Sequence, residues 1–122
     1  MRVTAAIVLL AAVSAGCSIL GYRDVNDLKS EAKYRLSKEI DRDPVLVYRD
    51  VVRALAVCTR NSVAAPYRAL TSNLDRDTDH GEISLTHEGR FIARYEISKT
   101  GDGKAQVSGW WLIGAQSCQP SL

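Results

Sequence analysis

The sequence predicts an α+β domain in which one or two N-terminal helices pack on a three-stranded antiparallel β-meander, in the order α-α-β-β-β. Apolar residues recur at helical spacing in the first half of the chain, and apolar and polar residues alternate in the last third. Periods near 3.6 and near 2 distinguish amphipathic helices from half-buried strands. The chain has 122 residues, 46% of them hydrophobic, so it is long enough for one core and is not disordered in composition.

Residues 24–40 carry the first helical pattern. Asp24 and Asp27 are candidate N-caps, because aspartate accepts hydrogen bonds from the free N–H groups of a first turn. Apolar residues recur every four positions between charged ones, at Leu28, Ala32, Leu36 and Ile40. This is the spacing of one helix face, and the narrow stripe predicts loose packing on the rest of the domain.

Asp43-Pro44 marks the start of a second, better-defined helix, because aspartate caps a first turn and proline is favoured at the first helical position. The helix is predicted from Val45 to about Thr59. Its apolar face comprises Val47, Val51, Leu55 and Cys58 and is widened by Tyr48 and Val52. The opposite face is basic and carries Arg49, Arg53 and Arg60.

Three segments of the last third alternate with period two, which is typical of strands. Their apolar residues have odd numbers: Ile83 and Leu85; Phe91, Ala93, Tyr95 and Ile97; Ala105, Val107, Trp111 and Ile113. For these residues to share one face, each connecting loop must hold an odd number of residues. Loops at 88–90 and 100–104 meet this condition, so the odd face is expected to pack on the helices.

The N-terminus carries an export signal. One positive charge, Arg2, precedes an apolar run at residues 3–13 that is too short to span a bilayer. The run ends in Ser14-Ala15-Gly16-Cys17, which resembles the lipobox of bacterial lipoproteins. The resemblance implies cleavage before Cys17 and its modification with acyl chains such as palmitate. The class prefers Leu, Val or Ile where Ser14 stands, so cleavage by an ordinary signal peptidase, giving a soluble periplasmic protein, is the alternative.

This resemblance divides the chain into a signal peptide at residues 1–16, a lipidated tether at 17–23 and a small periplasmic domain at 24–122. Ser18 after the cysteine implies export to the outer membrane, with the domain facing the periplasm. Loss of Arg2 with the signal lowers the formal net charge from +2 to +1. Neither this charge nor the location suggests a nucleic-acid partner.

The remaining cysteines, Cys58 and Cys118, form an even pair in an oxidising compartment. A disulfide between them is predicted, closing a loop of about 60 residues and stabilising the fold by roughly 4 kcal/mol in the chain-entropy model. Two separate buried thiols are the alternative. The two cysteines lack the close ligand spacing of a zinc site.

Few residues suggest site chemistry. Asp75, Asp77 and Asp79 alternate like the start of a calcium loop, but the glycine comes one residue late and Thr86 stands where the bidentate glutamate belongs. They are a weak metal candidate, and a solvated turn explains them equally well. The two histidines, His80 and His87, belong to no catalytic motif. The sequence therefore predicts no enzyme, no metal and no cofactor.

The even face of the predicted sheet is mostly polar, but three apolar residues interrupt it: Ile92, Trp110 and Leu112. An exposed apolar cluster with an aromatic residue is typical of a protein-binding site. The alternative is that the first helix, or residues 63–70, covers the cluster.

Together these features favour a lipid-anchored, non-enzymatic binding or assembly module for an envelope protein. The alternatives are a periplasmic inhibitor of a cell-wall hydrolase or protease, acting through a loop at residues 71–81, and a small hydrolase. In the order of its predicted elements the domain also resembles the small lipoprotein subunit of the outer-membrane β-barrel assembly machinery. That resemblance concerns the fold alone and transfers no functional residue.

Overall fold

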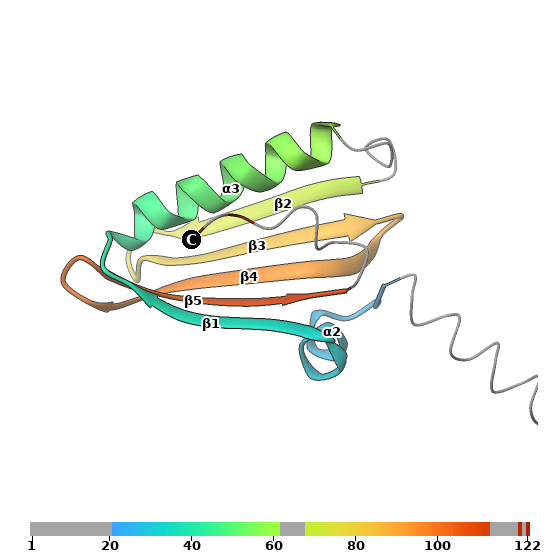
Figure 1. The fold of residues 1–122 in the computed structure, drawn as a ribbon, viewed down its shortest axis with the longest axis horizontal. Helices are drawn as coiled ribbons and strands as arrows, with labels where there is room; N and C mark the ends of the chain where they lie inside the picture. The colour runs from blue at the N-terminus through green and yellow to red at the C-terminus, as the bar shows by residue number, and fades with distance from the viewer. Residues whose placement is uncertain (1–20, 62–67, 113–119, 121) are drawn as a thin grey trace, which may run out of the picture.

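The computed structural model of the protein describes residues 21–61, 68–112, 120 and 122. Its body is a five-stranded antiparallel sheet with the strand order β1-β5-β4-β3-β2. A long helix, α3, covers one face, which we call the inner face; a short helix, α2, lies against β4 and β5 (Figure 1). The elements are α2 (Val25–Glu31), β1 (Tyr34–Ile40), α3 (Pro44–Asn61), β2 (Arg68–Asp75), β3 (His80–His87), β4 (Arg90–Gly101) and β5 (Lys104–Trp111).

The predicted α-α-β-β-β fold is wrong. The three predicted strands exist as β3, β4 and β5, but β1 pairs with β5 and β2 pairs with β3, so the sheet has five strands. The described elements run α-β-α-β-β-β-β. The resemblance in element order to the outer-membrane assembly subunit therefore no longer holds.

The error at residues 24–40 has a clear physical cause. Helix α2 begins where predicted, with the Asp24 carboxylate accepting a hydrogen bond of 2.7 Å from the Asn26 N–H, but it ends at Glu31. The rest of the segment is β1, whose Leu36 and Ile40 pack against the core. Residues four apart lie on the same face of a strand and on nearly the same face of a helix. A four-residue spacing therefore does not distinguish the two.

Strand β2 was missed because its alternation is incomplete. Leu70 and Leu74 are half-buried on the inner face, but the position between them is the exposed Ser72. The strand lies at the edge of the sheet, where a strand can remain largely exposed and still hydrogen-bond along one side.

The prediction for α3 is confirmed. The Asp43 carboxylate caps the helix by accepting a 2.8 Å hydrogen bond from the Val45 N–H, and Pro44 is the first helical residue. Val47, Val51 and Leu55 are buried against the sheet. Most odd residues of β3–β5 form the other half of this core, as predicted: Ile83, Leu85, Ala93, Tyr95, Ile97, Ala105, Val107 and Trp111. The prediction is wrong for Phe91, which pairs with Thr86 and is not part of the core, and Ile113 lies outside the described residues.

The odd residues beyond the turns, from Ala93 in β4 and from Ala105 in β5, share one face because each hairpin contains a bulge. The turns hold two residues each, 88–89 and 102–103, and two-residue turns alone would pair odd with even residues. Ile92 and Thr100 are each skipped in the pairing, which restores odd-to-odd register. The sequence prediction of odd-length connections was thus satisfied by a turn plus one bulged residue.

Candidate functional site

The strand pairing aligns polar side chains in two parallel rows on the sheet face opposite α3, which we call the outer face. The first row crosses all five strands and contains Thr71, Ser84, Arg94, Trp110 and Arg35. The second row lies beside it and contains Asn73, Glu82, Glu96, Ser108 and Ser37. Residues opposite one another on neighbouring strands are close enough for their side chains to interact.

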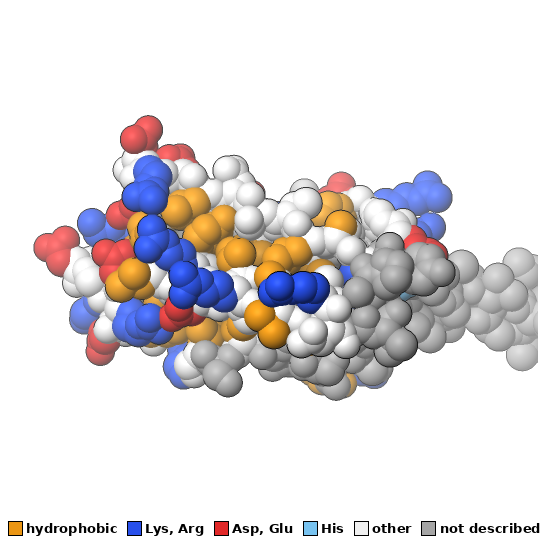
Figure 2. Space-filling model, turned by 90° about the horizontal axis from the view of Figure 1, so that it is seen from above, with side chains coloured by type: hydrophobic (Ala, Val, Ile, Leu, Met, Phe, Trp, Pro, Cys, Tyr) orange, Lys and Arg blue, Asp and Glu red, His pale blue; other side chains and the backbone are white. Residues whose placement is uncertain are grey.

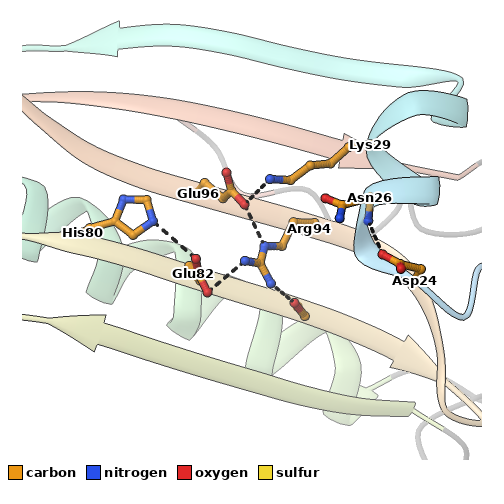
Figure 3. A network of polar contacts seen from close by, with 8 residues as sticks. Asp24, Asn26, Lys29, His80, Glu82, Arg94 and Glu96 are labelled. Atoms are coloured by element: carbon orange, nitrogen blue, oxygen red, sulfur yellow. Dashed lines mark hydrogen bonds and ion pairs between the residues drawn. The ribbon is translucent and has the colours of Figure 1, made fainter.

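Arg94 is the centre of a polar network on this face (Figure 3). Its Nη2 lies 2.9 Å from Glu82 Oε2, its Nε lies 3.1 Å from Glu96 Oε2, and its Nη1 donates a 2.8 Å hydrogen bond to Ser84 Oγ. The Arg94 side chain is 12% exposed and that of Glu96 is 20% exposed. Such partly buried, charge-assisted hydrogen bonds hold the guanidinium in a fixed orientation.

Lys29 joins α2 to this network. Its Nζ lies 2.6 Å from Glu96 Oε2 and 4.8 Å from the centroid of the Trp110 ring. Burial alone would raise the pKa of Glu96, but the hydrogen bonds and charges of Lys29 and Arg94 outweigh burial and lower that pKa. Glu96 is therefore a stable carboxylate that ties the helix to the sheet.

A small hollow opens beside Arg94 on β2, β3 and β4. Its volume is about 120 Å³, and it is lined by Thr71, Ser72, Asn73, Glu82, Ser84 and Arg94. The lining offers hydroxyl, amide and carboxylate groups. Such groups suit hydrogen bonding to a polar segment of another molecule.

The predicted apolar cluster lies next to this network and is largely covered. Ile92, the bulged residue of β4, is 7% exposed and packs under Gly21. Leu112 packs against the core, and its N–H donates a 3.0 Å hydrogen bond to the Ile92 carbonyl. Trp110 is half-buried under Lys29. The first helix thus lies beside these residues, and their binding of a partner stays a prediction.

Asp75 is the last residue of β2, and Asp77 and Asp79 lie in the turn that connects β2 to β3. The Asp77 N–H donates a 2.9 Å hydrogen bond to the Asp75 carboxylate, and Asp79 has a φ of 51°. This is the local bonding of an aspartate-rich turn. Within the part of the chain that the structure describes, no three His, Cys, Asp or Glu side chains converge as metal ligands would.

The two histidines lie at opposite ends of β3. His80 Nε2 lies 3.4 Å from Glu82 Oε1, at the margin of the network. His87 is half-buried at the other end of the strand. Their separation along β3 gives them different surroundings, and the prediction that the protein is no enzyme stays a prediction.

Cys58 is half-buried on α3 beside the core and is part of a disulfide. Cys17 and Cys118 both lie outside the described residues. The pairing of Cys58 with Cys118 and the lipidation of Cys17 therefore stay predictions.

The sequence analysis missed the Arg94 network. Its residues stand on the predicted polar face, but the contacts among Glu82, Arg94 and Glu96 depend on the exact pairing of β3 with β4. The contribution of Lys29 depends on a helix that lies more than sixty residues earlier in the chain. Alternation of polar residues shows which face they share and does not show their register.

No protein-family model, curated protein or solved structure matches this chain. Among residues 21–61 and 68–112, no helix is both long and apolar enough to cross a membrane.

Proposed function

We propose that the protein is a lipid-anchored, non-enzymatic envelope module that binds a partner protein through the outer face of its sheet. The proposal joins two lines of reasoning. The lipobox-like Ser14-Ala15-Gly16-Cys17 suggests attachment to the outer membrane on its periplasmic side. The outer face supplies the contact surface.

The observation that carries the contact surface is the alignment of Trp110 with Arg94 in one cross-strand row, directly beside the polar hollow. A half-buried aromatic ring next to a fixed arginine is the composition of binding hot spots. Because the guanidinium is already held by Glu82 and Glu96, little side-chain entropy would be lost when a partner binds.

The alternative function, a periplasmic inhibitor, was expected to act through a loop at residues 71–81. Most of residues 71–81 belong to β2 and β3, and only residues 76–79 form a turn between them. This leaves a short connection in place of a long projecting segment.

Site-specific photo-crosslinking in intact cells tests the contact surface. A photoreactive residue at Asn73, exposed at the rim of the hollow, should give one discrete protein adduct, whereas the same residue at Lys99, near the β4–β5 turn, should not. The adduct should disappear in Trp110→Ala protein that keeps its parental unfolding midpoint. Equal adducts from both positions, or an adduct that survives Trp110→Ala, would contradict the proposal.

The anchor is tested separately, by the intact mass of protein purified from membranes. A mature chain beginning at Cys17 with the mass of acyl chains added is expected. A mature chain without acyl chains would refute the anchor and leave the contact surface untouched.

A further inference from the structure

The solvent-facing side of α3 carries a ridge of arginines and aliphatic residues. Spacings of three and four residues place side chains on one side of a helix. The members of this α3 ridge are all exposed: Leu46, Arg49, Arg53, Val57 and Arg60. Figure 2, a view onto this side of the molecule, shows Lys and Arg side chains in a row among hydrophobic ones.

Among the described residues, no acidic side chain forms an ion pair with the arginines of the ridge. The one acidic residue of α3, Asp50, forms an ion pair with Arg42, whose Nη2 lies 2.6 Å from Asp50 Oδ2. None of the ion pairs among the described residues involves Arg49, Arg53 or Arg60. Three guanidinium groups therefore present their charge to the surroundings.

The aliphatic members of the ridge are exposed to an unusual degree. Leu46 is 47% exposed and Val57 is 50% exposed, and they are the large hydrophobic residues most open to solvent among the described residues. Val57 lies between Arg53 and Arg60, and Leu46 lies about one turn before Arg49 on the same side of α3. Aliphatic side chains beside cations occur on helices that lie in the interface of an anionic membrane.

We propose that the α3 ridge rests on the anionic phospholipid headgroups of a membrane and orients the domain against it. Guanidinium groups bind phosphate oxygens in a bidentate manner, and the shallow aliphatic side chains can enter the headgroup layer. The charge of the ridge selects an anionic surface, and its mixed composition favours lipid over a purely acidic protein patch.

The geometry of the tether agrees with this occupant, a point that rests on the lipid anchor of the proposed function. Gly21, the first described residue, follows Cys17 by four residues, so the two lie within about 14 Å of each other. Tyr22, bridged to Phe91, and the C-terminal end of α3 lie toward the same end of the sheet (Figure 1). One membrane surface can therefore meet both the anchor and the ridge.

Vesicle flotation tests the ridge without the anchor. The full chain carrying Cys17→Ser is mixed with phosphatidylcholine vesicles, or with vesicles containing 30% phosphatidylglycerol. The apolar run at residues 3–13 should bind both kinds of vesicle, so the readout is the ratio of the two partition constants. Each cation near an anionic surface strengthens binding roughly fivefold. Arg49→Gln/Arg53→Gln/Arg60→Gln should therefore lower the ratio by up to roughly a hundredfold.

Two matched variants complete the experiment. Arg76→Gln/Lys99→Gln/Lys104→Gln removes the same number of charges from exposed turn and strand-end positions and should keep most of the ratio. Arg49→Lys/Arg53→Lys/Arg60→Lys keeps the charge of the ridge and should lose no more than a few-fold. Urea unfolding verifies that each variant is folded.

The outcomes decide the proposal. A preference for anionic vesicles that is lost only with the ridge charges, and lost for the parent in 0.5 M NaCl, supports it. No anionic preference in the parent chain, or an equal loss in the control triple variant, overturns it. Because Cys17 is not acylated in this assay, failure here is distinct from failure of the anchor or of the outer-face partner.

Discussion

Replacing Arg94 with leucine removes the guanidinium on which two carboxylates and a hydroxyl depend. Losing one partner of a buried ion pair costs roughly 3–5 kcal/mol. Here the cost is reduced, because Glu82 is 41% exposed and Glu96 keeps Lys29 at 2.6 Å. We expect Arg94→Leu to lower the free energy of unfolding by about 2–3 kcal/mol at pH 7.

Double-mutant cycles measured by urea unfolding separate the two ion pairs of Arg94. Combining Arg94→Leu with Glu96→Gln should give a coupling energy of about 1–2 kcal/mol, because Arg94 and Glu96 are 12% and 20% exposed. Combining it with Glu82→Gln should give less than about 1 kcal/mol, the usual value for an exposed pair. The matched Lys29→Met variant should weaken the attachment of α2 while leaving the Arg94–Glu82 coupling unchanged.

The refuting results are definite. If Arg94→Leu unfolds at the parental urea concentration, the network contributes no net stability and the leucine packs as well as the ion pairs did. If the coupling to Glu82 exceeds the coupling to Glu96, burial does not govern the strength of these pairs.

Four further predictions concern the cap of α3, the core and two titrating groups. Asp43→Ala should lower the free energy of unfolding by about 1 kcal/mol, measured by urea unfolding, because the first turn of α3 loses a hydrogen-bond acceptor. An unchanged unfolding midpoint would show that the Asp43 cap does not stabilise the protein. Gly81→Ala should cost about 1–3 kcal/mol, because the new methyl group would overlap the Tyr48 ring, and Tyr48→Leu should relieve part of that cost. Glu96 has a lower pKa in the folded than in the unfolded protein, so its stabilising effect is present above about pH 4.5 and is lost as the pH falls through the lowered folded value. Glu96→Gln should accordingly be less stable than the parent at pH 7 and equal to it in strong acid, and a constant difference would contradict this. Burial raises the pKa of Tyr95 to about 12. The stability that depends on neutral Tyr95 should then be lost as the pH rises above 10. In a titration of tyrosine absorbance, Tyr95→Phe should lack the ionisation step that occurs at the highest pH in the parent.

Local signals in the sequence predicted the elements that local chemistry determines. Asp43 and Pro44 specify the start of α3 through a side-chain hydrogen bond and a fixed backbone angle, and neither depends on the rest of the fold. The odd-numbered core of β3 to β5 was predicted for a similar reason, because period two over long segments has one simple explanation. The residues that pack, such as Ile83 and Val107, were therefore found.

Features that depend on distant parts of the chain were not predicted. Leu36 and Ile40 satisfy a helix face and a strand face alike, and only their pairing with Gly109 and Ala105 selects the strand. The Arg94 network likewise requires both the register of β3 on β4 and the position of α2. A sequence pattern shows on which face of an element a residue lies, but it does not show which residue lies beside it on the neighbouring element.

The two bulges give each hairpin one residue that is skipped in the pairing of its two strands. Deleting Thr100 would leave Lys99 opposite Ala105 and Ile97 opposite Val107, so the core residues of both strands would keep their side of the sheet. A deletion within a paired segment differs: without Ser108, Trp111 would turn away from the core and Trp110 toward it, because side chains alternate between the two faces. In any relative of this protein, single-residue changes of length should therefore fall at the two bulges and not within the paired segments.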